Sequence, residues 1–215
     1  MLRKVVVVEP LSRSNTCFYC QHGNDHTVVV CEACQKIQPF PAVSPNFFDI
    51  FELSPSLEID DKSLRDRFYS LSQKTHPDTQ AQKDDFTQMQ AARWSTLINK
   101  AFQTLKITKT RLDYILELNP QINKLTSPPP RELAESYFEL QEVLMEGDNQ
   151  TALNSFFSLL ELADLKNQKD WAELVSDWQR NPSQDGLLLR LKQFTDNQKY
   201  LDSLKADLIK KRGLL

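Results

Sequence analysis

Glycine, histidine and methionine are scarce in this chain, with 4, 3 and 3 copies among 215 residues. The scarcity of glycine, and the lack of strand-like apolar alternation beyond residue 45, predict a mainly α-helical protein. The chain has no glycine-rich loop of the kind that cradles phosphate, and no set of nucleophile, base and orienting residue. The sequence therefore predicts no enzymatic activity and no catalytic residues.

A long apolar run and a strong charge of either sign are also missing. No stretch of about 18 apolar residues occurs, so we expect no transmembrane helix and no membrane partner. A net charge of −3 gives no general attraction for nucleic acid. The first sixteen residues combine Arg3, Lys4 and Arg13 with a β-like valine run, which fits neither a secretory signal nor a full transit peptide. We expect a reducing compartment: the cytoplasm, or alternatively the mitochondrial matrix.

The cysteines are confined to one short segment. They form two CxxC pairs separated by ten residues, and each CxxC turn delivers two thiolates from a single loop. We expect a structural zinc ion in a small β zinc-ribbon-like module over residues 1–44, with ligands Cys17, Cys20, Cys31 and Cys34. Gly23-Asn24-Asp25 is expected to turn, and Val28-Val29-Val30 to return as a strand.

Other chemistry is open to these cysteines. They could form two disulfides or a redox dithiol, but a reducing compartment and the absence of a thioredoxin-like βαβ pattern favour a metal. The same cage could hold iron, because ligands alone do not select the metal. Since all four positions are filled, the ion should be structural, and it should fold a segment with little core of its own. His22 and His26, between the pairs, are expected to be loop residues.

Residues 45–119 read as a helical hairpin, set off by prolines at 39, 41 and 45. Residues 46–53 form a short apolar helix, and Asp60 or Asp61 can cap the next helix. That helix and a later one carry apolar residues at helical spacing, which can face each other as a core. The two stripes are Leu64, Phe68 and Leu71, and Trp94, Ile98, Ala101 and Leu105.

The tripeptide His76-Pro77-Asp78 lies at the tip of this hairpin. Proline restricts the residue before it and its own φ, so the turn presents an imidazole and a carboxylate at fixed relative positions. A charged helical face is usually only a solvated one, but here the basic helix leads directly into the turn, which favours a docking role. The cations concerned are Lys62, Arg65, Arg67 and Lys74. The alternative for His76 and Asp78 is a local helix-capping pair.

The order of short helix, basic helix, HPD turn and apolar helix resembles the J domain of DnaJ-type co-chaperones. NFFDIFEL at 46–53, INKAFQTL at 98–105 and RLDYILEL at 111–118 are similar to segments of the HscB family, which is dedicated to iron–sulfur cluster assembly. A tetracysteine module is known in the eukaryotic-type branch of that family. One departure is Thr79, where the family commonly has lysine.

The resemblance implies a co-chaperone that performs no chemistry itself. Asp78 would accept a charge-assisted hydrogen bond from an arginine of a DnaK-class ATPase, His76 would add a polar contact, and Pro77 would hold both in place. The four cations would steer the domain onto an acidic partner surface. This contact would accelerate ATP hydrolysis by favouring the hydrolysis-competent conformation of the partner.

The remaining chain reads as a proline-rich linker, residues 120–130, and a C-terminal three-helix bundle, residues 131–215. The linker is expected to be too proline-rich for a helix and partly extended. In the bundle, the apolar groups of residues 153–160 and 171–178 are in phase, so one helix from about 149 to 180 should carry both. Residues 133–144 and 187–208 supply the other two stripes.

Some side chains fall off the bundle stripes. Phe138 and Met145 lie about 120° from the core stripe of their helix, among acidic residues. Tyr200 is also expected to point away from the core. The family resemblance implies that an IscU-type scaffold binds here, through Phe138, Glu139, Glu142, Glu146 and Tyr200.

The sequence is consistent with three functions. The leading one is a co-chaperone that delivers an IscU-type scaffold to a DnaK-class chaperone, and a J protein with another client is a variant of it. A zinc-ribbon protein-interaction or nucleic-acid-associated module with a helical appendage is the second, but residues 1–44 carry only four cations. A thiol oxidoreductase using one CxxC is the third. Self-association through the cysteine module is a further expectation.

Overall fold

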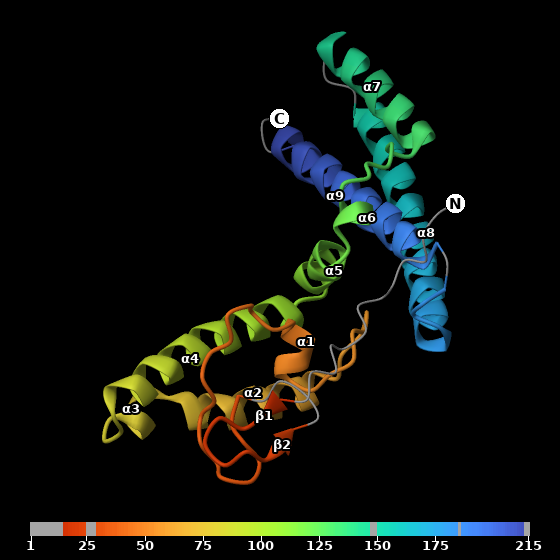
Figure 1. Cartoon of the computed structure of the whole chain (residues 1–215). Helices are drawn as coiled ribbons and strands as arrows, with labels where there is room; N and C mark the ends of the chain where they lie inside the picture. The colour runs from red at the N-terminus through yellow and green to blue at the C-terminus, as the bar shows by residue number, and fades with distance from the viewer. Residues whose placement is uncertain (1–14, 25–28, 147–149, 185, 213–215) are drawn as a thin grey trace. The chain divides into compact units, whose positions relative to one another are not determined.

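The structure is a computed structural model that describes residues 15–24, 29–146, 150–184 and 186–212. It confirms a mainly helical protein (Figure 1). The chain divides into two compact units, and the boundary between them in the sequence lies between Ile115 and Leu116. The cysteine module and the HPD hairpin fall in the same unit. None of the helices in the described part of the chain is long and apolar enough to cross a membrane.

The first unit is built on a helical hairpin. Helix α1 (Phe47–Ile50) precedes α2 (Asp61–Thr75), α3 (Pro77–Gln80), α4 (Asp85–Lys106) and α5 (Thr108–Glu117). The helices α2 and α4 lie side by side, with α3 at the tip where they meet (Figure 1). Asp60, one of the two predicted caps, accepts a 2.8 Å hydrogen bond from Ser63 N–H and so starts α2.

The predicted apolar stripes form the core of this unit. All four stripe residues of α4 are buried, and on α2 Leu64 is buried while Phe68 is half-buried. The Phe68 ring stacks on Phe102 at 4.0 Å between centroids. Burying one such side chain stabilises a fold by about 1.5–3 kcal/mol, so these apolar stripes supply much of the free energy that holds α2 and α4 together.

Arg111, in α5, is a buried cation that the sequence pattern did not single out. Its guanidinium donates to the carbonyl of Leu57 from two nitrogens, at 3.1 and 2.9 Å, and to the carbonyl of Leu105 at 2.6 Å. Burial lowers the pKa of this guanidinium. Arg111 thereby ties the loop before α2 to the end of α4.

The cysteine module contains a short antiparallel pair of strands, β1 (Asn15–Thr16) and β2 (Gly23–Asn24). The prediction that Gly23-Asn24 turns was therefore wrong, because both residues pair with β1. Asp25 and Val28, in the predicted turn and return strand, lie outside the described residues. Val30 forms a single bridge with Ile37, which brings the second half of the module back on itself.

The module packs on α4 through residues 37–40. The indole Nε1–H of Trp94 donates to the carbonyl of Gln38 at 2.7 Å, and Phe40 N–H donates to Oε1 of buried Gln90, also at 2.7 Å. The Phe40 ring lies 4.9 Å from the Trp94 ring, with the Arg93 guanidinium 4.4 Å from its centroid. The module and the hairpin are therefore one packed body.

The second unit holds α6 (Pro120–Asn123), α7 (Arg131–Glu146), α8 (Gln150–Arg180) and α9 (Leu187–Arg212). The single long helix predicted from about 149 to 180 is confirmed as α8. The prediction of no helix in the linker was wrong for Pro120–Asn123, because proline is well suited to the first helical position. The three long helices share one core of Leu133, Leu140, Leu153, Phe156, Leu160, Leu201, Leu204 and Leu208.

Candidate functional site

The four cysteine sulfurs converge, with every pair within 4.8 Å. Two separations are 3.6 Å, from Cys17 to Cys34, and 3.8 Å, from Cys20 to Cys31. Tetrahedral coordination with metal–sulfur bonds of about 2.3 Å places sulfurs about 3.8 Å apart. All four thiols are free, so this arrangement fits a four-thiolate metal cage and does not pair the sulfurs as disulfides.

The two CxxC turns repeat one backbone geometry. In each, the N–H of the first cysteine donates to the carbonyl five residues on, and the N–H four residues on donates back to that cysteine's carbonyl. The lengths are 2.7 and 3.1 Å in the Cys17 turn, and 3.0 and 3.0 Å in the Cys31 turn. The glutamine after each pair has positive φ, 60° at Gln21 and 56° at Gln35, a conformation that favours glycine.

The neighbouring thiols shift the pKa values of Cys17 and Cys20 in opposite directions. Burial raises the pKa of Cys17, but hydrogen bonds from the backbone of Cys20 and Tyr19, together with those from the thiols of Cys20 and Cys31, outweigh it and bring the pKa to about 6. At Cys20 a hydrogen bond from the backbone of His22 lowers the pKa, yet burial and the neighbouring thiols raise it to about 12. Cys17 therefore ionises more readily than Cys20, and a cation bound between the two would favour the thiolate form of Cys20 as well.

Of the two histidines between the cysteine pairs, the structure describes His22. His22 is exposed, and its carbonyl accepts the N–H of Cys17, so its part in the module is a backbone one. His26 lies outside the described residues.

The HPD tripeptide is both a cap and an exposed tip. His76 ends α2 and is the N-cap of α3, where its Nδ1 accepts the N–H of Asp78 at 3.2 Å. Pro77 occupies the first turn of α3. The Asp78 side chain is 92% exposed, with Oδ2 3.6 Å from His76 Nδ1. The local capping role is thus present, and it leaves the Asp78 carboxylate directed to solvent.

Two side chains after the tripeptide fasten α3 to the end of α2. The Thr79 hydroxyl donates to the carbonyl of Gln73 at 2.8 Å, and the Gln80 amide donates to the carbonyl of Lys74 at 2.8 Å. These carbonyls belong to the last turn of α2, where backbone carbonyl groups have no hydrogen-bond donor within the helix itself. The sequence shows Thr79 only as a departure from the lysine that is common in the family, and it does not predict these bonds. We call the hydrogen bond from the Thr79 hydroxyl to Gln73 the Thr79 clasp.

The four predicted basic residues do not form one free surface. Lys62, Arg65 and Lys74 are exposed on α2. Arg67 instead donates to the carbonyl of Phe51 at 2.5 Å and forms a 3.2 Å ion pair with Glu52. It therefore joins α2 to the end of α1, and its charge is partly compensated before any partner arrives.

The predicted scaffold-binding residues of the bundle differ in their exposure to solvent. Phe138 and Met145 are 68% and 86% exposed, and Glu139 and Glu142 are exposed as well. The Glu146 side chain lies outside the described residues. Tyr200 was wrongly expected to point away from the core: it packs against the core cluster, and burial raises the pKa of its hydroxyl. A helical wheel misses this because the neighbouring helices cover more than one stripe of α9.

Known proteins resemble both the sequence and the fold. The iron–sulfur cluster co-chaperone HscB homolog of Arabidopsis thaliana is 30% identical over 158 residues, which cover 73% of this chain and 60% of that protein. The co-chaperone HscB homolog of Acinetobacter baylyi is 34% identical over 130 residues, 60% of this chain and 68% of that protein. No family model matches the chain.

Solved structures agree in fold. Human co-chaperone HscB superimposes with a TM-score of 0.61 over 94% of this chain and all of that one, at 20% identity. HscB from Vibrio cholerae gives 0.50 over 79% of this chain and 99% of that one, at 25% identity.

Together, the HPD-tipped hairpin, the following helical bundle and these relatives show that the class of protein this chain resembles is that of the co-chaperones. More particularly, the chain belongs to the HscB co-chaperone family. It matches about three fifths of the length of the Arabidopsis relative.

Proposed function

We propose that this protein binds an IscU-type iron–sulfur scaffold through its C-terminal bundle and delivers it to a DnaK-class chaperone. Contact with the HPD tip then stimulates the chaperone's ATPase. The observation that carries the proposal is the Asp78 carboxylate, which is exposed at the tip of the hairpin while His76 and the Thr79 clasp fix the backbone around it. The cargo class rests on the iron–sulfur role named for the Arabidopsis relative.

The contact would work by shape and charge alone. A carboxylate held at a rigid turn can accept a charge-assisted hydrogen bond from a partner arginine, at little entropic cost. Lys62, Arg65 and Lys74 would add long-range attraction for an acidic partner surface. Binding that favours the hydrolysis-competent state of the partner raises its ATPase rate, and this chain needs no catalytic group of its own.

We further propose that the four cysteines hold zinc as a structural ion. The convergence of the sulfurs and the filled four-ligand set support this role. The ion would act as a cross-link that fixes the two CxxC turns, and through residues 37–40 the face of α4. The segments 1–44, 45–119, 120–130 and 131–215 would then serve as metal module, docking hairpin, linker and scaffold-binding bundle.

Co-purification with two single variants tests this division of labour. The wild-type chain should retain both a DnaK-class chaperone and an iron–sulfur scaffold. Asp78→Asn should lose the chaperone and keep the scaffold, whereas Phe138→Ala should keep the chaperone and lose the scaffold. Exposed Leu162→Ala on α8 is the matched control for Phe138 and should keep both. Retention of the chaperone by Asp78→Asn would refute the proposed role of the tip.

A further inference from the structure

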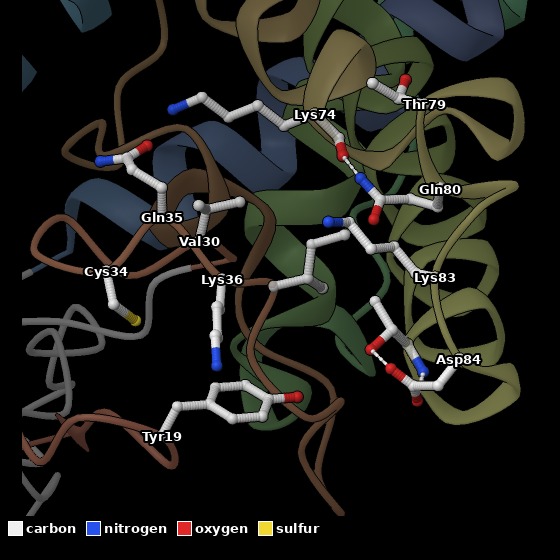
Figure 2. A pocket seen from close by; sticks show the side chains of 12 residues that line it. Tyr19, Val30, Cys34, Gln35, Lys36, Lys74, Thr79, Gln80, Lys83 and Asp84 are labelled. Carbon is white, nitrogen blue, oxygen red and sulfur yellow. Dashed lines mark hydrogen bonds between the residues drawn. The ribbon is translucent and has the colours of Figure 1, made fainter.

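A cleft of about 640 Å³ opens between the cysteine module and the tip of the hairpin, within the first unit. One wall comes from the module, including Tyr19, Cys34, Gln35 and Lys36. The other comes from the end of α2, α3 and the start of α4 (Figure 2). A cleft of this volume can hold several side chains of a bound segment, and it is larger than the space that one small ion occupies.

The hairpin wall of this cleft carries two cations, Lys74 and Lys83, and Lys83 extends toward the module in Figure 2. Neither forms an ion pair with another residue among those that the structure describes. The one carboxylate on this wall, Asp84, is engaged as the cap of α4. It accepts the N–H and the hydroxyl of Thr87, at 3.0 and 2.7 Å, and these bonds lower its pKa.

The module wall is different in charge. Lys36 lies over the Tyr19 ring, with Nζ 4.8 Å from the centroid, and its carbonyl is held by Cys31 N–H. Four thiolates around one divalent ion would leave a net charge of −2 beside Cys34, which Lys36 offsets in part. An anionic ligand would therefore be attracted mainly to the hairpin wall, and Lys36 would contribute less than Lys83.

The cleft is continuous with the HPD tip. Thr79 and Gln80, which follow Asp78 directly, line the cleft while their side chains are fixed on the last carbonyls of α2. A partner that contacts Asp78 reaches the cleft within the next residues of the same short helix. The cleft is thus placed as an extension of the proposed docking tip.

We propose that this cleft is a second docking surface for the DnaK-class partner and takes a short acidic peptide segment of it. The inference rests on the proposed function and deepens it. The tip supplies the contact that stimulates hydrolysis, whereas the cleft adds affinity and selects an acidic partner. The cysteine module thereby becomes one wall of the chaperone site.

Binding of the full-length chain to the ATP-bound partner tests the proposal through charge reversals. At low salt, Lys83→Glu should raise Kd about 5–10-fold and Lys36→Glu about 2–3-fold, with smaller effects near 0.3 M salt. Lys83→Arg should bind like wild type. Lys169→Glu, an exposed lysine of α8 with the same change in net charge, is the control and should also bind like wild type. Circular dichroism and metal content check that each variant is folded.

Wild-type affinity of both Lys83→Glu and Lys36→Glu, beside a clear loss for Asp78→Asn, would overturn this inference and leave the proposed function standing. A labelled octapeptide of aspartate and glutamate separates the opposite case. If it binds the full chain saturably and Lys83→Glu abolishes that binding, the acidic-peptide cleft stands even where Asp78→Asn has no effect. If ATP displaces the peptide and neither lysine variant changes chaperone affinity, the cleft is a small-anion site and the proposal is wrong.

Discussion

The indole Nε1–H of Trp94 donates a 2.7 Å hydrogen bond to the backbone carbonyl of Gln38, across 56 residues of sequence. Within the cysteine module, Gln38 forms further hydrogen bonds: its Oε1 accepts Phe18 N–H at 3.0 Å and its N–H donates to the carbonyl of Val29 at 2.8 Å. Phe18 lies between the first two cysteines. One glutamine therefore connects the candidate metal site to the buried face of the HPD hairpin.

Gln38→Ala should destabilise the first unit by about 1–3 kcal/mol, because the N–H of Phe18 would lose its acceptor and the carbonyl of Lys36 would lose one of its two donors. Chemical denaturation followed by circular dichroism measures the change. Gln73→Ala is the matched control: this glutamine is exposed on α2, and its loss should change stability by no more than about 0.5 kcal/mol. Equal effects of the two variants would contradict the role given to Gln38.

Metal removal should loosen α4 and leave the bundle unchanged. A chelator under reducing conditions would release the CxxC turns, and with them the acceptor for Trp94 and the packing of Phe40. Hydrogen exchange measured by mass spectrometry should show faster exchange in α4 and unchanged exchange in α8. Equal protection of α4 with and without chelator would mean that the module is not coupled to the hairpin.

Thr79→Val should weaken stimulation of the partner ATPase by about 3–10-fold, because it removes the hydroxyl that fastens α3 to the carbonyl of Gln73. Thr79→Ser keeps the hydroxyl and should restore most of the activity. Since Thr79 is exposed, the thermal stability of the valine variant should stay near wild type. Valine and serine variants of equal activity would show that the clasp does not position Asp78.

The bundle should lose stability above about pH 10. Burial and a hydrogen bond to Asp207 raise the pKa of Tyr137 from 10.0 to about 12. The folded state thus holds this proton more tightly than the unfolded state, so the stabilisation is complete below pH 10 and is lost as the pH rises through about 12. Tyr137→Phe should flatten that part of the stability–pH curve. An unchanged slope in the variant would assign the loss to other groups.

Local patterns predicted the helices and the metal ligands because each depends on residues close in sequence. The stripe from Trp94 to Leu105, the long α8 and the paired CxxC turns all follow from spacing. The bonds from Trp94 to Gln38 and from Arg111 to Leu57 could not be predicted, since each joins residues more than 50 positions apart. Tyr200 was misplaced for the same reason: periodicity gives the direction of a side chain and not the neighbour that covers it.

Two local errors had signals in the sequence. Gly23 and Asn24 are typical of turns, but their pairing with β1 decides their conformation. Pro120 follows Asn119 and is suited to start a helix, but the prolines at 128–130 favoured the prediction of an extended linker over the whole segment. The positive φ of Gln21 and Gln35 had no such signal, because glutamine has no preference for that conformation.

Single-turnover ATP hydrolysis by the DnaK-class partner tests most directly whether the Asp78 carboxylate carries the proposed contact with the chaperone. The wild-type chain should accelerate hydrolysis, and Asp78→Asn should abolish the acceleration while its circular dichroism and its binding to the scaffold stay unchanged. Full acceleration by Asp78→Asn would contradict the account.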